Sequence, residues 1–311
     1  VSMASVQQAL GPLFLLILAG ALLGWKRFPG EGFWSELERL IYYVLFPAML
    51  VSTLARADMA SVPVVALASV MLGAMLLFAA ALWLSWRHAP DWLSRHMGDA
   101  ASFTSLFQGS IRFNSYVGVA GAAALHGSAG ATVAAVALAL MVPAANLLCV
   151  MAFIGAGTLG EGGLLRSLKA LTRNPLVLAC LAGTALNLSG IGLPGWSGDA
   201  ISLLGRAALP LGLVAVGVAL RPRVLVSSGS VAWLASLLKL LAMPALVVVL
   251  CRWFGLEGVA RDVAILFAAL PTATSAYILA RQLGGNAELM AALITAQTLL
   301  AMLTLPLWLA T

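Results

Sequence analysis

The sequence predicts an all-α polytopic membrane protein of ten transmembrane helices, arranged as two inverted repeats of five. Three observations lead to this prediction. Apolar residues dominate the composition, they occur in ten runs that are each long enough to cross a bilayer, and several prolines recur at one fixed offset between the two halves of the chain.

The composition excludes a soluble protein. Hydrophobic residues make up 62% of the 311 positions and charged residues only 9%, whereas a soluble globular domain has about 25% charged residues. The formal net charge is +6, but no basic patch interleaved with aromatic residues accompanies it, so we expect no nucleic-acid partner. The cysteines Cys149, Cys180 and Cys251 lie far apart in apolar runs, which predicts packing roles with no metal site and no cofactor.

Helical spans follow from the apolar runs, because a helix needs about 20 apolar residues to cross the hydrocarbon core. The predicted spans are 7–26, 34–55, 62–86, 99–124, 128–153, 174–190, 199–220, 229–251, 261–283 and 287–310. The loops between them are short, and the longest is the Gly-rich stretch 154–173. We therefore expect a single membrane domain over residues 1–311.

The distribution of lysine and arginine predicts the orientation, because these residues concentrate in cytoplasmic loops. Eleven lie in loops and helix ends that follow odd-numbered spans, and three follow even-numbered spans. The eleven are Lys26, Arg27, Arg39, Arg87, Arg95, Arg166, Lys169, Arg173, Arg221, Arg223 and Arg281; the three are Arg56, Arg252 and Arg261. Both termini are thus predicted outside, in a multi-pass protein of a bacterial inner membrane.

Proline pairs separated by 163 residues indicate an internal repeat. The pairs are Pro12 with Pro175, Pro47 with Pro210, and Pro143 with Pro306. The two halves, about 7–153 and 174–310, hold five spans each, so the second half enters the membrane from the opposite side. Inverted repeats of this kind are typical of secondary transporters. Chance spacing of prolines, which membrane helices tolerate, is the alternative.

Polar interruptions at corresponding positions of spans 4 and 9 predict two broken helices that cross near the middle of the membrane. The interruptions are Gln108–Tyr116 and Pro271–Tyr277, and the offset maps 108–114 onto 271–277. Pro271 removes a backbone donor, and Gly109 loosens its helix. The free N–H groups where the second half of a broken helix begins favour an anion. Polar residues that only join ordinary helices are the alternative.

Three cationic side chains lie inside predicted spans: Arg112, Arg206 and Lys239. A central Arg or Lys costs roughly 2.5–3.5 kcal/mol on insertion scales, and no Asp or Glu lies near the middle of a span to offset this cost. A bound organic anion would supply the missing negative charge. Snorkelling or contacts with backbone carbonyls are the alternative, and Arg206 could also pair with Asp199.

Six short motifs occur along the chain in a characteristic order. They are Leu45–Met49, Arg112–Asn114, Arg173–Pro175, Ala208–Leu211, Leu270–Thr274 and Tyr277–Gln282, followed by Gly284 and Gly285. In this order they resemble the auxin efflux carrier family over about 7–311, a family that includes plant PIN-type auxin carriers and bacterial permeases linked to malate and malonate. Ser275 stands where many bacterial members have Asn, and Gln108 rather than Pro is the partner of Pro271.

The resemblance implies a fold similar to bile-acid/sodium symporters, with a scaffold of helices 1, 2, 6 and 7 and a transport domain of helices 3–5 and 8–10 that moves as an elevator. It implies a secondary transporter of a small organic anion, such as a dicarboxylate or an auxin-like acid, and no enzyme. Together with the charges, it predicts substrate contacts at Arg112, Asn114, Pro271, Thr272, Thr274, Ser275 and Lys239. Supporting or ion-binding roles are predicted for Gln108, Asn146, Gln297 and Arg206. Elevator proteins are often dimers through the scaffold, so a homodimer surrounded by lipid is expected.

Other functions stay open at this stage. Amides such as Asn114, Asn146 and Gln297 could hold Na+, so a sodium-coupled organic-anion symporter of the bile-acid type is the alternative. Coupling to H+ lacks an obvious carrier, because all three histidines fall in predicted loops, and a uniporter driven by membrane potential needs nothing further. A channel is less favoured, since the Asn174-Pro175 pair has only Gly11-Pro12 as its repeat partner. An intramembrane serine protease would need a histidine near Ser197.

Overall fold

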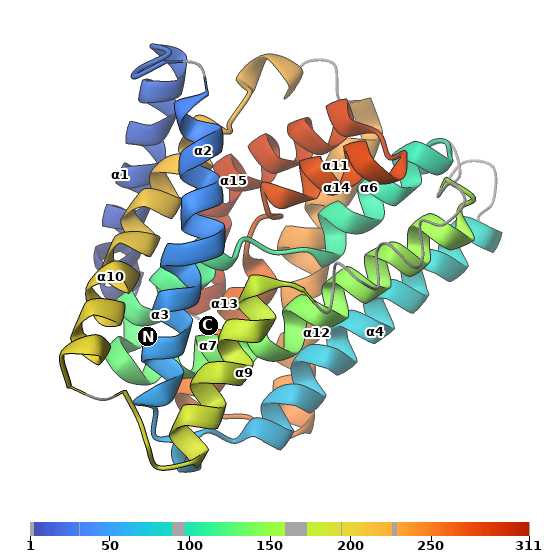
Figure 1. Cartoon of the computed structure of the whole chain (residues 1–311). Coiled ribbons are helices and arrows are strands. Elements are labelled where there is room, and N and C mark those ends of the chain that lie inside the picture. Colours follow the sequence, from blue (N-terminus) through green and yellow to red (C-terminus); the bar gives the residue numbers. More distant parts are fainter. Residues whose placement is uncertain are drawn as a thin grey trace.

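The computed structural model describes residues 3–30, 32–88, 97–158, 173–193, 195–225 and 229–310, and the regular structure in these ranges is helical (Figure 1). The helices are α1 (Met3–Trp25), α2 (Phe33–Leu40), α3 (Phe46–Ala55), α4 (Val64–His88), α6 (Ala100–Ile111), α7 (Ser115–Gly155), α9 (Pro175–Leu188), α10 (Gly195–Val218), α11 (Gly229–Leu237), α12 (Met243–Trp253), α13 (Gly258–Ala269), α14 (Ser275–Leu283) and α15 (Ala287–Leu309). The π-helical turns η1 (Ile41–Leu45) and η4 (Leu238–Ala242) join α2 to α3 and α11 to α12, and the short 3₁₀ turns are η2 (Met59–Ser61) and η3 (Pro222–Leu225).

The chain is a polytopic membrane protein by the length and composition of its helices. Within the described ranges, seven helical stretches are long and apolar enough to cross a membrane, and α9 is a shorter apolar helix. The stretch Ala100–Gly155 covers two predicted spans, and Gly127 inside it has non-helical torsion angles (φ 59°, ψ −138°). The ten-span count therefore stays a prediction. Most of the predicted loop 154–173 lies outside the described residues, as do Arg95, Arg166 and Lys169.

Side chains with an oxygen close to the backbone begin several helices. Asp99 accepts a hydrogen bond from the Ser102 N–H at 2.9 Å at the start of α6, and Asn286 accepts one from the Leu289 N–H at 3.0 Å at the start of α15. Each bond satisfies an N–H that has no partner within the helix. Hydrogen bonding to Ser102 also holds the pKa of the Asp99 carboxyl below its usual value.

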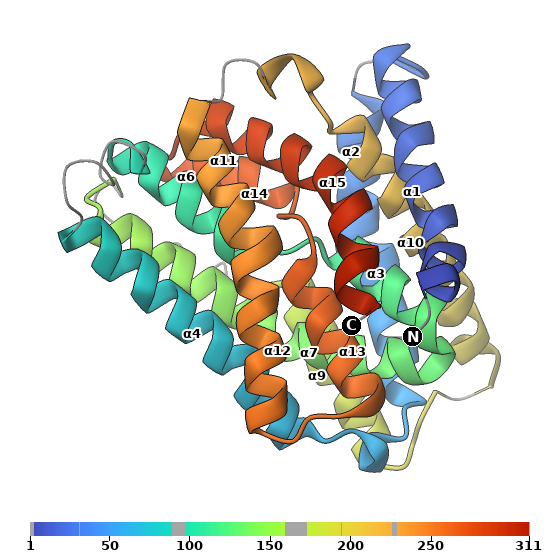
Figure 2. The same cartoon turned by 180° about the vertical axis from the view of Figure 1, so that it is seen from behind.

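The helices pack into two groups. In the first, α1 lies along α10, and α3 packs against α9 and α10 (Figure 1). In the second, α12 lies against α4 and α13, while α15 contacts α6, α13 and α14 (Figure 2). The long helix α7 contacts α4, α6 and α13 of the second group and α1, α3, α9 and α10 of the first; it is counted with the second group because it follows α6 in the chain. The division of the predicted spans into a scaffold and a transport domain stays a prediction.

Glycines bring α1 and α10 into backbone contact. A Cβ atom on Gly217 would meet the carbonyl oxygen of Ile17, and one on Gly20 would meet the carbonyl oxygen of Val214. Helices in lipid gain little from hydrophobic association, so close packing of small residues takes its place. The α1–α10 pair is therefore a tight element of the first group.

Gly217→Ala is expected to lower stability by roughly 1–3 kcal/mol, because the two backbones must move apart to admit the methyl group. The melting temperature of the purified protein in detergent measures this loss. Gly73→Ala is the matched control, since nothing lies within 4 Å of a Cβ atom built on Gly73 of α4. Equal melting temperatures for the two variants would contradict the close contact of α1 with α10.

Candidate functional site

Two interruptions of helical structure meet inside the second group. The chain leaves the helix between α6 and α7 at 112–114, and between α13 and α14 at 270–274. The Asn114 N–H donates to the Pro271 carbonyl oxygen at 2.9 Å, so the two breaks touch. Apart from Leu270, the residues of both breaks lie within the polar interruptions that the sequence singles out in predicted spans 4 and 9.

Gln297 of α15 holds the two breaks together. Its Oε1 accepts a hydrogen bond from the Thr272 N–H at 2.9 Å, and its Nε2 donates to the Gly109 carbonyl oxygen at 3.0 Å. The side chain is fully buried, so no water competes for these groups. One backbone group of each broken helix is thereby satisfied away from solvent.

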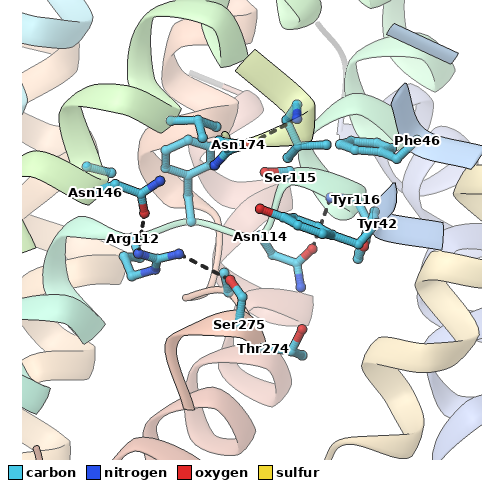
Figure 3. Close-up of a pocket in the computed structure, with 15 residues that line it drawn as sticks. Tyr42, Phe46, Arg112, Asn114, Ser115, Tyr116, Asn146, Asn174, Thr274 and Ser275 are labelled. Atoms are coloured by element: carbon cyan, nitrogen blue, oxygen red, sulfur yellow. Dashed lines mark hydrogen bonds between the residues drawn. The ribbon is translucent and has the colours of Figure 1, made fainter. Parts of the chain in front are cut away.

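A cavity of about 120 Å³ lies beside the breaks, between the two helix groups (Figure 3). Its lining residues are Tyr42, Phe46, Arg112, Phe113, Asn114, Ser115, Tyr116, Val142, Ala145, Asn146, Asn174, Leu176, Ala273, Thr274 and Ser275. None of these residues is acidic. Of the predicted site residues, Arg112, Asn114, Asn146, Thr274 and Ser275 are therefore brought to one place.

Three helices begin at this cavity. Asn114 caps α7 by accepting from the N–H groups of Tyr116 and Val117 at 3.1 and 3.2 Å. Asn174 caps α9 in the same way, accepting from Leu176 at 2.9 Å and Val177 at 3.4 Å. The third helix, α14, begins at Ser275. Each helix start carries a partial positive charge, so the three together favour a negatively charged occupant.

Arg112 spans the cavity wall with two hydrogen bonds to neutral groups. Its Nη1 donates to Asn146 Oδ1 at 2.7 Å and its Nη2 donates to Ser275 Oγ at 3.2 Å (Figure 3). Its Nε and the Asn114 Nδ2 are buried donors for which the described residues offer no acceptor. A guanidinium that is held by neutral partners keeps its full positive charge available.

The opposite wall comes from the first helix group and was not predicted. Tyr42 and Phe46 extend from the η1–α3 segment, and Phe46 packs edge-on against Tyr116 with ring centroids 4.9 Å apart (Figure 3). Asn174 was recognised only as part of a motif. An Asn directly before a proline is a signature of a helix start. Because the anion site was expected at helix starts, this signature could have added Asn174 to the predicted site.

Three predicted residues lie behind the breaks rather than in the cavity. Pro271 contributes its carbonyl oxygen to Asn114, as described above, and Thr272 and Gln108 are fully buried. The Thr272 hydroxyl and both polar atoms of the Gln108 amide have no hydrogen-bond partner among the described residues. The side chains of Gln108 and Thr272 therefore stabilise neither break by a hydrogen bond.

Arg206 and Lys239 do not line the cavity. Arg206 is exposed on α10, and Asp199, the partner considered for it, lies 3.6 Å from Arg56 instead. Lys239 is buried on the far side of the α6–α7 break, next to Ile111. The structure thus separates these two cations from Arg112.

The prediction that the histidines lie in loops is wrong for two of them. His88 is the last residue of α4, and His126 lies in α7 directly before the bend at Gly127; His96 is outside the described residues. His126 Nε2 lies 3.1 Å from Asp262 Oδ2 on α13, with both side chains mostly buried. For His126 the reason is that the chain bends at Gly127 alone and forms no loop there, so the residue before the bend stays helical.

In the described ranges, no three His, Cys, Asp or Glu side chains gather as metal ligands.

Comparison with known proteins identifies transporters. The family model described as "Membrane transport protein" matches residues 164–309. An uncharacterized transporter of Methanothermobacter thermautotrophicus is 29% identical over 310 residues, which is 98% of each chain. Two rice proteins, probable auxin efflux carrier components 1b and 1d of Oryza sativa subsp. japonica, are each 31% identical over 120 residues. That stretch is 37% of this chain and 22% of each rice protein.

Gln297→Leu is expected to lower the melting temperature, because it leaves the Thr272 N–H and the Gly109 carbonyl buried without partners. Each orphaned group costs about 1–3 kcal/mol. Thr298→Val is the control on the same helix, since the Thr298 hydroxyl bonds only to the Ile294 carbonyl within α15. A Gln297→Leu variant as stable as Thr298→Val would contradict the bridging role.

Proposed function

We propose that this chain is a secondary membrane transporter of the auxin efflux carrier family and not an enzyme, and that it carries a small organic anion across a bacterial-type inner membrane. The substrate class is a carboxylate, for example a dicarboxylate or an auxin-like acid. The binding site is the cavity beside the two helix breaks.

One observation carries this proposal: the cavity offers positive charge and unused donors, and no acid. Arg112 Nε and Asn114 Nδ2 are buried without acceptors among the described residues, and three helices begin beside the same space. A carboxylate would accept from both donors and offset the cost of the buried guanidinium.

The shape of the site supports a small substrate with an apolar part. A volume of about 120 Å³ holds several water-sized molecules, which suits a small carboxylic acid better than a lipid. Polar donors lie on the side of Arg112 and Ser275, while Tyr42 and Phe46 offer aromatic faces on the other side. This arrangement favours an amphipathic anion whose carboxylate faces the breaks.

An elevator mechanism is the motion that we propose. The polar contacts that join the breaks, through Asn114, Pro271 and Gln297, all lie within the second helix group, so that group can move as one body with its substrate. The first group would be the scaffold. Its contact with the moving group includes Arg221, whose N–H donates to Thr295 Oγ1 at 2.9 Å and whose guanidinium lies 5.3 Å above the Tyr277 ring. An elevator step would break this contact.

The inverted repeat is part of the same proposal, with ten spans, repeats at about 7–153 and 174–310, and both termini outside. The hydrogen bond from Arg112 to Ser275 supports it, because these residues are separated by 163 positions, the offset of the proline pairs. Equivalent positions of two inverted repeats are expected to meet near the axis that relates them.

Besides uniport, two coupling ions are candidates: Na+ and H+. Unpartnered buried oxygens of Gln108 and Thr272 favour sodium symport, since Na+ binds such oxygens. The His126–Asp262 pair, with Nε2 3.1 Å from Oδ2, is the candidate for coupling to H+. Elevator proteins often form dimers through the scaffold, and we propose a homodimer of this kind. A channel is the least favoured alternative function.

Charge movement in proteoliposomes tests the function. Malate, malonate, indole-acetate and a bile acid are added in turn, with and without sodium, and the transient current on a supported membrane is recorded. A current for one carboxylate that saturates with concentration supports the carrier. Silence for every anion, in protein that is correctly folded and inserted, would overturn it.

Arg112→Met is expected to raise the half-saturating substrate concentration by about 10- to 100-fold, because a charged hydrogen bond contributes roughly 1.5–3 kcal/mol. Arg252→Met is the matched control, since Arg252 is exposed at the end of α12. Equal currents from both variants would remove Arg112 from the site.

Asn114→Asp separates helix capping from anion binding. The Asp carboxylate keeps an oxygen for the N–H groups of Tyr116 and Val117, so the melting temperature should change little. The donor Nδ2 is lost and a negative charge is added, so the current should fall by at least about tenfold. Unchanged current in this variant would argue against a carboxylate at Asn114.

A further inference from the structure

The first helix group contributes a polar residue to the cavity in addition to its two aromatic side chains. Asn174 lines the cavity, is 7% exposed, and caps α9 with its Oδ1 (Figure 3). Its Nδ2 takes no part in the cap and carries two hydrogens, so it can donate to an anion in the cavity even while it interacts with Tyr42. The start of α9 adds its own partial positive charge at the same place.

This contact differs in one respect from those of Arg112 and Ser275. Both of these residues belong to the second helix group, which carries the substrate in the proposed elevator, so they stay with the anion through the whole cycle. Asn174 belongs to the first group, which stays in place. A residue of the stationary group contacts the anion in one state and is left behind in the other. What replaces Asn174 in the opposite state therefore matters for binding.

The packing of the first group identifies its equivalent positions. A Cβ atom on Gly20 of α1 would meet the backbone of Val214 of α10. A Cβ atom on Gly183 of α9 would meet the backbone of Val51 of α3. The offset of 163 residues converts the first pair of positions into the second, so the contact of α1 with α10 corresponds to the contact of α9 with α3.

A second pair of contacts obeys the same offset. A Cβ atom on Gly24 would lie 3.1 Å from the Cα atom of Val218. The equivalent positions are 187 and 55, and the Asn187 Nδ2 donates to the Ala55 carbonyl oxygen at 3.3 Å. Both matches support an inverted repeat in this group, in which α1 corresponds to α9 and α10 to α3.

The opposite state lacks an equivalent of Asn174. The same offset assigns Gly11 to Asn174, Gly205 to Tyr42 and Leu209 to Phe46. None of these three replacements has a side chain that can donate a hydrogen bond. Gly11 also lies inside α1, which continues past Pro12 from Met3 to Trp25, so no helix begins there. When the two repeats exchange their arrangements, Gly11 and α1 take the place that Asn174 and α9 have here.

On the basis of the proposed function, we infer that Asn174 and the start of α9 make the carrier one-sided. They hold the anion in the state described here, and no equivalent group holds it in the opposite state. A hydrogen bond to a charged group changes a binding constant by about 10- to 100-fold. In the predicted orientation α9 begins at the cytoplasmic side, since it follows the predicted loop 154–173. The anion is therefore bound more tightly from the cytoplasmic side than from the other.

Transport measured separately from the two sides tests this asymmetry. Inside-out membrane vesicles present the cytoplasmic side to added substrate, and right-side-out vesicles present the other side; the probes are radiolabelled malate, malonate and indole-acetate. In wild type, the half-saturating concentration should be at least about tenfold lower in inside-out vesicles. Asn174→Gly gives position 174 the residue of its equivalent, and glycine is tolerated before a helix. This variant should raise the inside-out value alone and remove most of the difference.

Two further variants complete the design. Asn286→Gly is the matched control, because Asn286 caps α15 in the same way and does not line the cavity. It should change both half-saturating concentrations by less than about twofold. Asn174→Asp keeps an oxygen for the cap and places a negative charge beside the anion, so it should raise the inside-out value at least as much as Asn174→Gly does. It answers the same question if the glycine variant does not fold.

Equal half-saturating concentrations on the two sides of wild type would overturn the asymmetry and leave the proposed function intact. An Asn174→Gly variant that keeps the wild-type difference would do the same. The rise in melting temperature on addition of each probe in detergent reports binding without transport. If no probe is carried, but one stabilises wild type and Asn286→Gly and not Asn174→Asp, transport fails and the contact with Asn174 stands. If no probe binds either, both proposals are overturned.

Discussion

Two interrupted helices inside an apolar bundle leave backbone N–H and C=O groups that neither water nor lipid can satisfy, and two buried side chains, Asn114 and Gln297, are placed to meet this demand. Asn114 caps α7, Gln297 bridges Thr272 and Gly109, and the Asn114 N–H reaches the Pro271 carbonyl. An unsatisfied backbone group in hydrocarbon costs several kcal/mol. The breaks can therefore exist only where the chain brings these residues together.

The same breaks give the interior its electrostatic polarity. The helices α7 and α14 begin beside the cavity that Arg112 lines, and the start of α9 adds a third positive helix end. Where α6 and α13 end, Ile111 and Ala268 line the apolar pocket that also contains Lys239. The cavity side of the crossover thus suits an anion, because helix starts carry a partial positive charge.

Local sequence patterns predicted the breaks because their causes are local. Proline at 271, glycine at 109 and the polar runs around them disfavour a continuous helix wherever they occur. The grouping of Arg112, Asn114, Thr274 and Ser275 in one cavity was predicted from the proposed repeat, which pairs the two interruptions. Tyr42 and Phe46 escaped prediction, since the packing of α3 against the crossover leaves no signature in their own segment. Asn174 before Pro175 does mark a helix start, but this mark was not used to place it in the site. Arg206 was placed near the site by helix order alone, but its side chain faces outward.

By itself, the sequence determined a polytopic membrane protein, the place of both helix breaks and the excess of cations over acids in the interior, because apolar length, proline and charge act through neighbouring residues. Only the tertiary structure decided which cation lines the cavity beside the breaks and which does not. Arg112 and Lys239 look alike in sequence, as single cations inside apolar runs. Their surroundings differ because long-range packing places Arg112 beside three helix starts and Lys239 among apolar side chains.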